Sequence, residues 1–79
     1  MDIKRDVAVQ NGLKPGDEVI VIKETGFHEG ELQLKTIDNI IVLEWTDEEA
    51  ARLNLPSREV QYNFTDGSSA GHWDRVRHI

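Results

Sequence analysis

The stretch NGLKPGDEVIV, Asn11 to Val21, contains the first clear structural signal of the chain. Pro15 and Gly16 are typical of a turn, because proline fixes one backbone angle and glycine tolerates conformations that other residues avoid. The four β-branched residues that follow Glu18 form an apolar run too short for a buried helix, and they favour a strand buried on both faces. We therefore place the start of a β domain at Gly16.

The next segment predicts a hairpin over residues 31–45. In ELQLKTI, Leu32 and Leu34 alternate with polar residues, which predicts a half-exposed strand with the two leucines facing the core. Asp38-Asn39 predicts a tight turn, because both residue types tolerate left-handed backbone angles. The apolar run IIVLEW that follows then predicts the paired strand of the hairpin.

One helix is predicted in TDEEAARLNLPS. Thr46 followed three residues later by Glu49 is a capping-box pattern, and Pro56 disfavours helical angles at the residue before it. Two more strands follow, EVQYNF and HWDRVRHI, separated by the loop TDGSSAG. The first of these strands presents on one face Val60, Tyr62 and Phe64.

The N-terminal segment IKRDVAVQN is ambiguous. A short helix capped by Asp2 would place Ile3 and Val7 on one face and end at Asn11-Gly12. Alternation of Val7 and Val9 indicates a strand instead. We favour the helix.

Five short strands in a chain of this length are best accommodated in a partly open barrel, which hides most strand edges. We expect one mainly β domain, residues 1–79, with the helix between the third and fourth strands. The segments KPGDEVIVI and YNFTDGSSAGHWDRVRHI resemble the first strand entry and the last hairpin of Tudor-like and other SH3-like barrels. That resemblance implies a five-stranded SH3-like barrel; OB-fold and Sm-like barrels are the alternatives.

A second resemblance concerns the N-terminal part, which is similar to the AbrB family of swapped-hairpin DNA-binding domains. The residues in register with the family motif are Ile3, Asp6, Val7, Gly12, Leu13, Pro15, Gly16 and Asp17. Lys4 and Asn11 depart from the motif, and the basic strand that precedes it in the family has no counterpart here. This resemblance implies a dimeric transcription regulator or an antitoxin.

Composition restricts the class of protein. The 79 residues include no cysteine, which excludes disulfides, thiolate zinc sites and thiol chemistry. We find no apolar run long enough for a signal peptide or for a membrane span. We therefore expect a soluble, cytoplasmic protein without membrane contact.

Charge is unevenly distributed along the chain. Of the net charge of −6, the segment Asp17–Glu49 contributes −8, from ten acidic and two basic residues, and the flanking segments are each close to neutral. A phosphate backbone is repelled by such a field, so we do not expect a nucleic-acid partner. A basic protein surface is the partner that this charge favours.

Residues that could support chemistry are sparse. The three histidines, His28, His72 and His78, lie in no metal-ligand spacing, and no metal or other cofactor is expected. The serines Ser57, Ser68 and Ser69 are explained by turns and have no nucleophile motif around them. We therefore expect no enzyme. The alternative, a small oligomeric enzyme of SH3-like fold, rests on VQY, which resembles the catalytic strand of plasmid-encoded type II dihydrofolate reductase.

The five aromatic residues provide the candidate binding site. Trp45 and Phe64 are in phase with apolar neighbours and are expected in the core. In SH3-like barrels the first long loop and the final hairpin lie together at the usual binding groove. On that resemblance the groove is lined by Phe27, Tyr62 and Trp73, with an acidic rim of Glu24, Glu29 and Glu31. The alternative places all five aromatics in the core.

These observations predict a non-catalytic binding module that docks a basic protein surface or peptide through an acidic, aromatic-lined face. A related hypothesis is an inhibitor whose acidic face mimics nucleic acid. The AbrB-like regulator and the oligomeric enzyme are the competing hypotheses.

Overall fold

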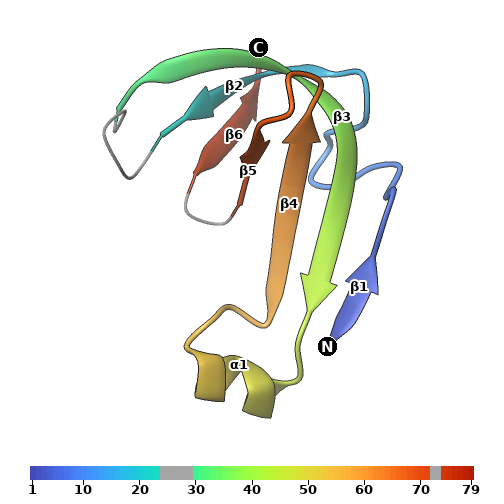
Figure 1. Ribbon diagram of the computed structural model, residues 1–79, viewed down its shortest axis with the longest axis vertical. Helices are drawn as coiled ribbons and strands as arrows, with labels where there is room; N and C mark the ends of the chain where they lie inside the picture. Colours follow the sequence, from blue (N-terminus) through green and yellow to red (C-terminus); the bar gives the residue numbers. More distant parts are fainter. Residues whose placement is uncertain (24–29, 72–73) are drawn as a thin grey trace.

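The computed structural model describes residues 1–23, 30–71 and 74–79, which form a mainly β domain with one helix (Figure 1). The elements in chain order are β1 (Asp2–Lys4), β2 (Glu18–Ile22), β3 (Leu32–Glu44), α1 (Asp47–Leu53), β4 (Arg58–Phe64), β5 (Ser69–Ala70) and β6 (Arg75–His78). All strand pairs are antiparallel, and the strands lie in the order β5-β4-β3-β2-β6, with β1 also paired to β3.

β3 is the strand that organises the fold. It is thirteen residues long and arches over the molecule, so that its two halves belong to different parts of the sheet (Figure 1). The N-terminal half, residues 32–36, pairs with β2. The C-terminal half, residues 37–44, pairs with β4 on one edge and, near its end, with β1 on the other.

The predicted hairpin over residues 31–45 is wrong, because the chain does not turn at Asp38-Asn39. The two predicted strands are one continuous strand, and the pairing with β4 shifts register between Ile37 and Asn39, which leaves the exposed Asp38 as an extra residue. A local turn would satisfy few backbone N–H and C=O groups. The extended chain instead pairs with β4 and, over residues 42–44, also with β1. The turn-forming residues therefore mark the bend of a strand.

The faces predicted for the N-terminal half of β3 are also wrong. Leu32 and Leu34 are 66% and 72% exposed, whereas Gln33 and Lys35 are half-buried. The register between β2 and β3 explains which side chains turn inward, because Gln33 and Lys35 lie opposite residues of β2 that are fully buried. Alternation gives the period of a strand but not the face that turns inward.

The core lies on the inner face of the bent sheet. Val19 and Val21 of β2 are fully buried, and Ile20 and Ile22 on the opposite face are only half-buried, so β2 is not buried on both faces as predicted. The buried cluster also contains Leu13, Ile37, Ile40, Tyr62, Phe64 and Ala70. Val60, Tyr62 and Phe64 share one face of β4 as predicted: Tyr62 and Phe64 are buried in the cluster, and Val60 packs against it.

The predicted helix is confirmed in α1. Both arms of the capping box are present: the Glu49 N–H donates to Thr46 Oγ1 at 3.2 Å, and the Thr46 N–H donates to Glu49 Oε1 at 3.2 Å. The helix ends at Asn54, which adopts the left-handed conformation with φ 55°. Within the described residues no helix is long and apolar enough to span a membrane.

The predicted N-terminal helix is not formed. The first residues instead form β1, in which Ile3 lies opposite Leu43 of β3. After β1 the chain passes through Asp6 with φ 53°, and the Val7 N–H donates to the Ile40 carbonyl at 3.0 Å. The open edge of β3 thus provides backbone partners that the short, β-branched helix could not match.

The sheet remains open, with β5 and β6 as the strands at its two ends. Strands β2 to β5 follow one another as neighbours, and β6 returns to pair with β2. The helix follows the second strand of this meander, not the third as predicted, because two predicted strands are the single strand β3.

Candidate functional site

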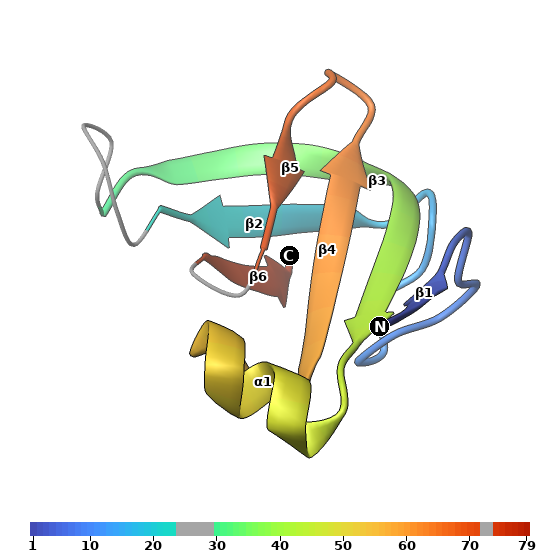
Figure 2. The same cartoon turned by 60° about the horizontal axis from the view of Figure 1, so that its bottom comes forward.

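A groove lies between β4, β6 and the turn that precedes β2, and we call it the β4–β6 groove. Its volume is about 510 Å³. In Figure 2 the arrowhead of β6 points toward β4. The residues that line the groove are Asn11, Leu13, Arg58, Glu59, Val60, Tyr62, Gly71, Asp74, Val76, Arg77 and His78.

The floor of the β4–β6 groove is apolar. Val60 and Tyr62 alternate along β4 and so share one face, and Val76 of β6 is a half-buried member of the same apolar surface. Leu13 is held there by a small bridge, in which the Leu13 N–H and the Gln10 N–H each donate to the other residue's carbonyl, at 2.9 and 2.8 Å. The floor is therefore built by three separate segments.

Tyr62 joins the floor to the wall of the groove. Its side chain is 6% exposed, and its hydroxyl accepts a hydrogen bond from Asn11 Nδ2 at 3.4 Å. Asn11 itself has a positive φ of 55°, which asparagine tolerates better than most residues. The turn before β2 thus positions a polar group against the only tyrosine of the chain.

The charges in the groove are balanced. Arg58 and Arg77 carry two positive charges, and Glu59 and Asp74 carry two negative charges. The carboxylate of Asp74 is 2% exposed and pairs with Lys23 Nζ at 3.4 Å. Lys23 is the last described residue before residues 24–29, and Asp74 is the first after residues 72–73. The ion pair therefore joins the points at which these two segments meet the described chain.

His78 also lines the groove. Its Nε2 lies 3.1 Å from the Gly12 carbonyl oxygen and 3.7 Å from Asp17 Oδ2. A hydrogen bond to the carbonyl requires the proton on Nε2. The pKa of Asp17 is lowered, first by the hydrogen bond from the Lys14 side chain and least by the charge of His78.

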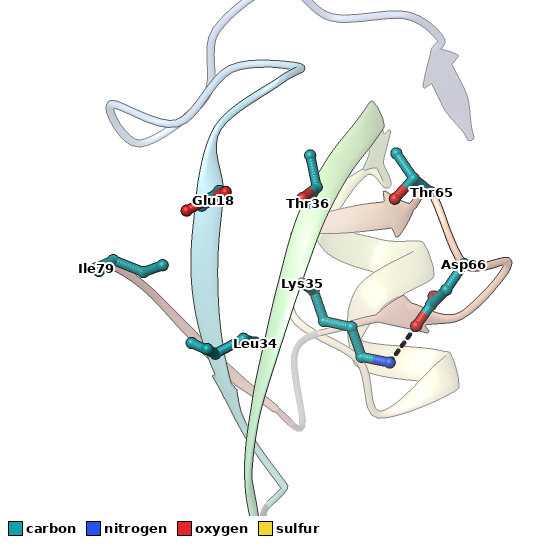
Figure 3. A pocket seen from close by; sticks show the side chains of 7 residues that line it. All are labelled: Glu18, Leu34, Lys35, Thr36, Thr65, Asp66 and Ile79. Carbon is teal, nitrogen blue, oxygen red and sulfur yellow. Dashed lines mark hydrogen bonds and ion pairs between the residues drawn. The ribbon is translucent and has the colours of Figure 1, made fainter.

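A second, smaller hollow of about 230 Å³ lies at the bend of β3 (Figure 3). Lys35 crosses it to form an ion pair with Asp66 of the β4–β5 turn, and the Asp66 carboxylate also accepts from the Ser68 N–H at 2.9 Å. The hydrogen bond from Lys35, followed by those from Ser68, holds the pKa of Asp66 well below its usual range. The remaining lining residues are Glu18, Leu34, Thr36, Thr65 and Ile79.

The described part of the predicted site comprises two of its six residues. Tyr62 lines the β4–β6 groove. Glu31 is exposed just before β3, is not in the groove lining, and accepts a hydrogen bond from Gln33 Nε2 at 3.2 Å. Gly71 and Asp74, on either side of residues 72–73, do line the groove. The other four predicted residues, Glu24, Phe27, Glu29 and Trp73, lie outside the described residues.

Sequence reasoning missed Asn11, Leu13 and Val76 as groove residues. Leu13 and Val76 carry the apolar signal of core residues, and the pairing of β6 with β2 that brings Val76 into the groove connects residues more than fifty positions apart. Asn11 had a local signal, since it stands in a turn sequence with Gly12. Its contact with Tyr62 depends on the fold.

Metal-ligating and nucleophilic side chains are scattered over the described residues. No group of three or more histidine, aspartate or glutamate side chains lies close enough to hold an ion among them. Ser68 donates its hydroxyl hydrogen bond to Asp66 inside the β4–β5 turn, as its sequence context predicts. Comparison of the chain with family models, curated proteins and solved structures gives no match.

Proposed function

We propose that this chain is a non-catalytic binding module that holds a segment of a partner protein in the β4–β6 groove. The observation that carries the proposal is the solvent-open groove with an apolar floor of Leu13, Val60, Tyr62 and Val76. Small binding sites typically combine such a floor with a few polar groups that orient the ligand. Asn11 and the groove arginines are polar groups of this kind.

The ion pair between Lys23 and Asp74 supports the aromatic part of the proposal. It brings together the ends of the two segments that contain Phe27 and Trp73, next to a groove that already includes Tyr62. We propose that Phe27 and Trp73 extend the apolar floor, with Glu24, Glu29 and Glu31 at its acidic rim. Aromatic anchors of this kind contribute most of the binding free energy in many interfaces.

The partner is proposed to be a basic protein surface or peptide. The described groove has balanced charge, so the sign of the long-range field comes from the rest of the chain, whose net charge is −6. Such a field raises the association rate of a positively charged partner and lowers that of an acidic one. The apolar floor then selects the segment that is held.

A partly open SH3-like barrel is the proposed architectural context. Its support is the strand order, since β2 to β5 form a meander and β6 returns beside β2, so that the two end strands of the sheet are consecutive in sequence. A small curved sheet with this order brings its ends toward each other as it coils. The groove lies between β6, at one end of the sheet, and β4, the neighbour of β5 at the other end.

The test uses two peptides of equal length with one central leucine, one rich in lysine and one rich in glutamate. We expect the lysine-rich peptide to bind more tightly and to shift the amide resonances of Val60, Tyr62 and Val76 of the ¹⁵N-labelled chain. Val76→Lys should abolish that shift, and the matched control Val9→Lys, at an exposed position outside the groove, should retain it.

Two outcomes would contradict the proposal. The first is a set of shifts that maps away from the groove residues or follows the glutamate-rich peptide. The second is a preference for a short DNA or RNA duplex over the lysine-rich peptide that persists at high salt.

A further inference from the structure

The N-terminal half of β3 leaves one of its edges unpaired within the described chain. The Ile37 N–H donates to the Asp17 carbonyl and the Lys23 N–H to the Glu31 carbonyl, so the odd-numbered residues of this half face β2. Even-numbered residues face the other way, as the Thr36 carbonyl shows by accepting from the Thr65 N–H at 3.0 Å. Leu32 and Leu34 therefore direct their backbone groups to an edge where no described strand pairs with them.

The side chains at this edge are unusually apolar for a solvent-facing position. Leu34 is the most exposed large hydrophobic residue of the described chain, at 72%, and Leu32 and Ile79 follow at 66% each. Across the outer face they lie opposite Ile20 and Ile22 of β2, which are half-buried. In Figure 1 this half of β3 runs along the rim of the molecule. An apolar, unpaired edge is a template for another strand.

We propose that a second copy of this chain covers the edge, with residues 31–35 of the two copies paired antiparallel about a two-fold axis at Gln33. In this register Leu32 of one copy lies opposite Leu34 of the other. Both leucines direct their N–H and C=O groups to the shared edge, so each such pair exchanges two backbone hydrogen bonds. The proposal does not rest on the proposed function of the groove.

The sequence of the edge, ELQLK, is self-complementary in this register. Glu31 of one copy comes opposite Lys35 of the other, at a spacing at which opposite charges attract. Lys35 keeps its ion pair with Asp66, because an ammonium group has three donors. This complementarity favours a second copy over an unrelated strand, and shifting the register by one residue would oppose backbone groups that point in different directions.

The leucines of the two copies also meet on one face. Within one copy Ile20 lies beside Leu34, and in the proposed register Leu34 lies beside Leu32 of the other copy, which in turn lies beside Ile22 of that copy. Four apolar side chains would therefore lie side by side across the two sheets. The β4–β5 turn limits the ladder, since Thr65 already occupies the edge beside Thr36 (Figure 3). The result is a short ladder and a weak, concentration-dependent dimer.

The first test is sedimentation velocity of the full chain from about 10 µM to about 1 mM, the range in which small interfaces dissociate. We expect a monomer–dimer equilibrium that Leu34→Lys weakens at least tenfold, because a charge is placed in the apolar row. Leu53→Lys is the matched control, since Leu53 is an exposed leucine on α1, and it should leave the equilibrium unchanged. A wild-type chain that stays monomeric, or equal dimerisation of both variants, would overturn the proposal.

The second test examines the register. At the two-fold axis, Gln33 of one copy lies opposite Gln33 of the other as a non-hydrogen-bonded pair. The Cα atoms of such a pair are about 4.5 Å apart, which is within the range of a disulfide. The chain has no cysteine, so Gln33→Cys should be oxidised to a covalent dimer at concentrations where Leu53→Cys stays monomeric. Equal rates for the two variants, with both correctly folded by circular dichroism, would exclude this register.

Discussion

The two halves of β3 belong to one strand but have opposite environments. The C-terminal half is paired along β4, and near its end also with β1, and its residues Ile40 and Val42 are essentially inaccessible to solvent. In the N-terminal half, Leu32 and Leu34 are paired only on the β2 side, and both are exposed to solvent. Apolar residues therefore stabilise the fold in the first case and form a surface for association in the second.

This difference shows that hydrophobicity alone does not assign a role to a strand residue. Leu34 and Ile40 are similar in apolar character, and the side of the sheet on which each lies decides whether it is core. The bend at Asp38 separates the two situations, because the extra residue changes the pairing register.

The largest expected effect is a truncation in the C-terminal half. Ile40→Ala should lower the free energy of unfolding by about 2–5 kcal/mol, because it leaves a cavity among fully buried neighbours. Leu34→Ala should change it by less than about 0.5 kcal/mol in dilute solution, because its side chain is exposed. Urea unfolding measures both values, and equal losses would erase the distinction between the two halves.

A smaller effect is expected from proline within the N-terminal half. Gln33→Pro removes an N–H that faces Val21 of β2, and leaving that partner unsatisfied should cost about 1–3 kcal/mol. Leu34→Pro removes an N–H directed to the open edge and should be tolerated better. If Leu34→Pro is the more damaging of the two in urea unfolding of dilute protein, the assignment of the edges is wrong.

The smallest effect concerns the ion pair that joins the N-terminal half to the β4–β5 turn. The pKa of Asp66 is lower in the folded chain than its ordinary value of 3.8, so its contribution to stability is present above pH 3.8 and is lost as the pH falls further. Asp66→Asn should therefore be less stable than wild type at neutral pH, and the difference should shrink in acid.

The measurement for this prediction is urea unfolding of both proteins between pH 7 and pH 2. The lowered pKa values of Asp17 and Glu49 act in both proteins and cancel in the comparison. A difference that stays constant with pH would show that the Lys35–Asp66 pair has no part in it. Added salt should reduce the effect, because the pair is close to solvent.

Local patterns in the sequence were sufficient for some elements. The capping box of Thr46 and Glu49 determines α1 through contacts within four residues, and the β-branched run of β2 needs only its own composition to be recognised. The resemblance in the last hairpin predicts Tyr62 in a binding groove; Tyr62 does line the β4–β6 groove, and its role in binding stays a prediction.

Long-range pairing determined what could not be predicted. Asp38-Asn39 carries a turn signal, and pairing with β4, which continues on both sides of these residues, keeps the chain extended. The face of Leu34 depends on its register with Ile20, and Val76 enters the groove because β6 pairs with β2. None of these partners can be read from the residues next to the position concerned.

The continuity of β3 through its bend is the claim on which the rest depends, and a nuclear Overhauser spectrum tests it directly. Close contacts are predicted between the Hα atoms of Leu34 and Ile20 and between those of Ile40 and Tyr62, which are non-hydrogen-bonded pairs in the two halves. Hα contacts between residues 32–36 and residues 40–44 of the same chain would instead show a hairpin at Asp38-Asn39. That result would contradict both the fold and the open edge.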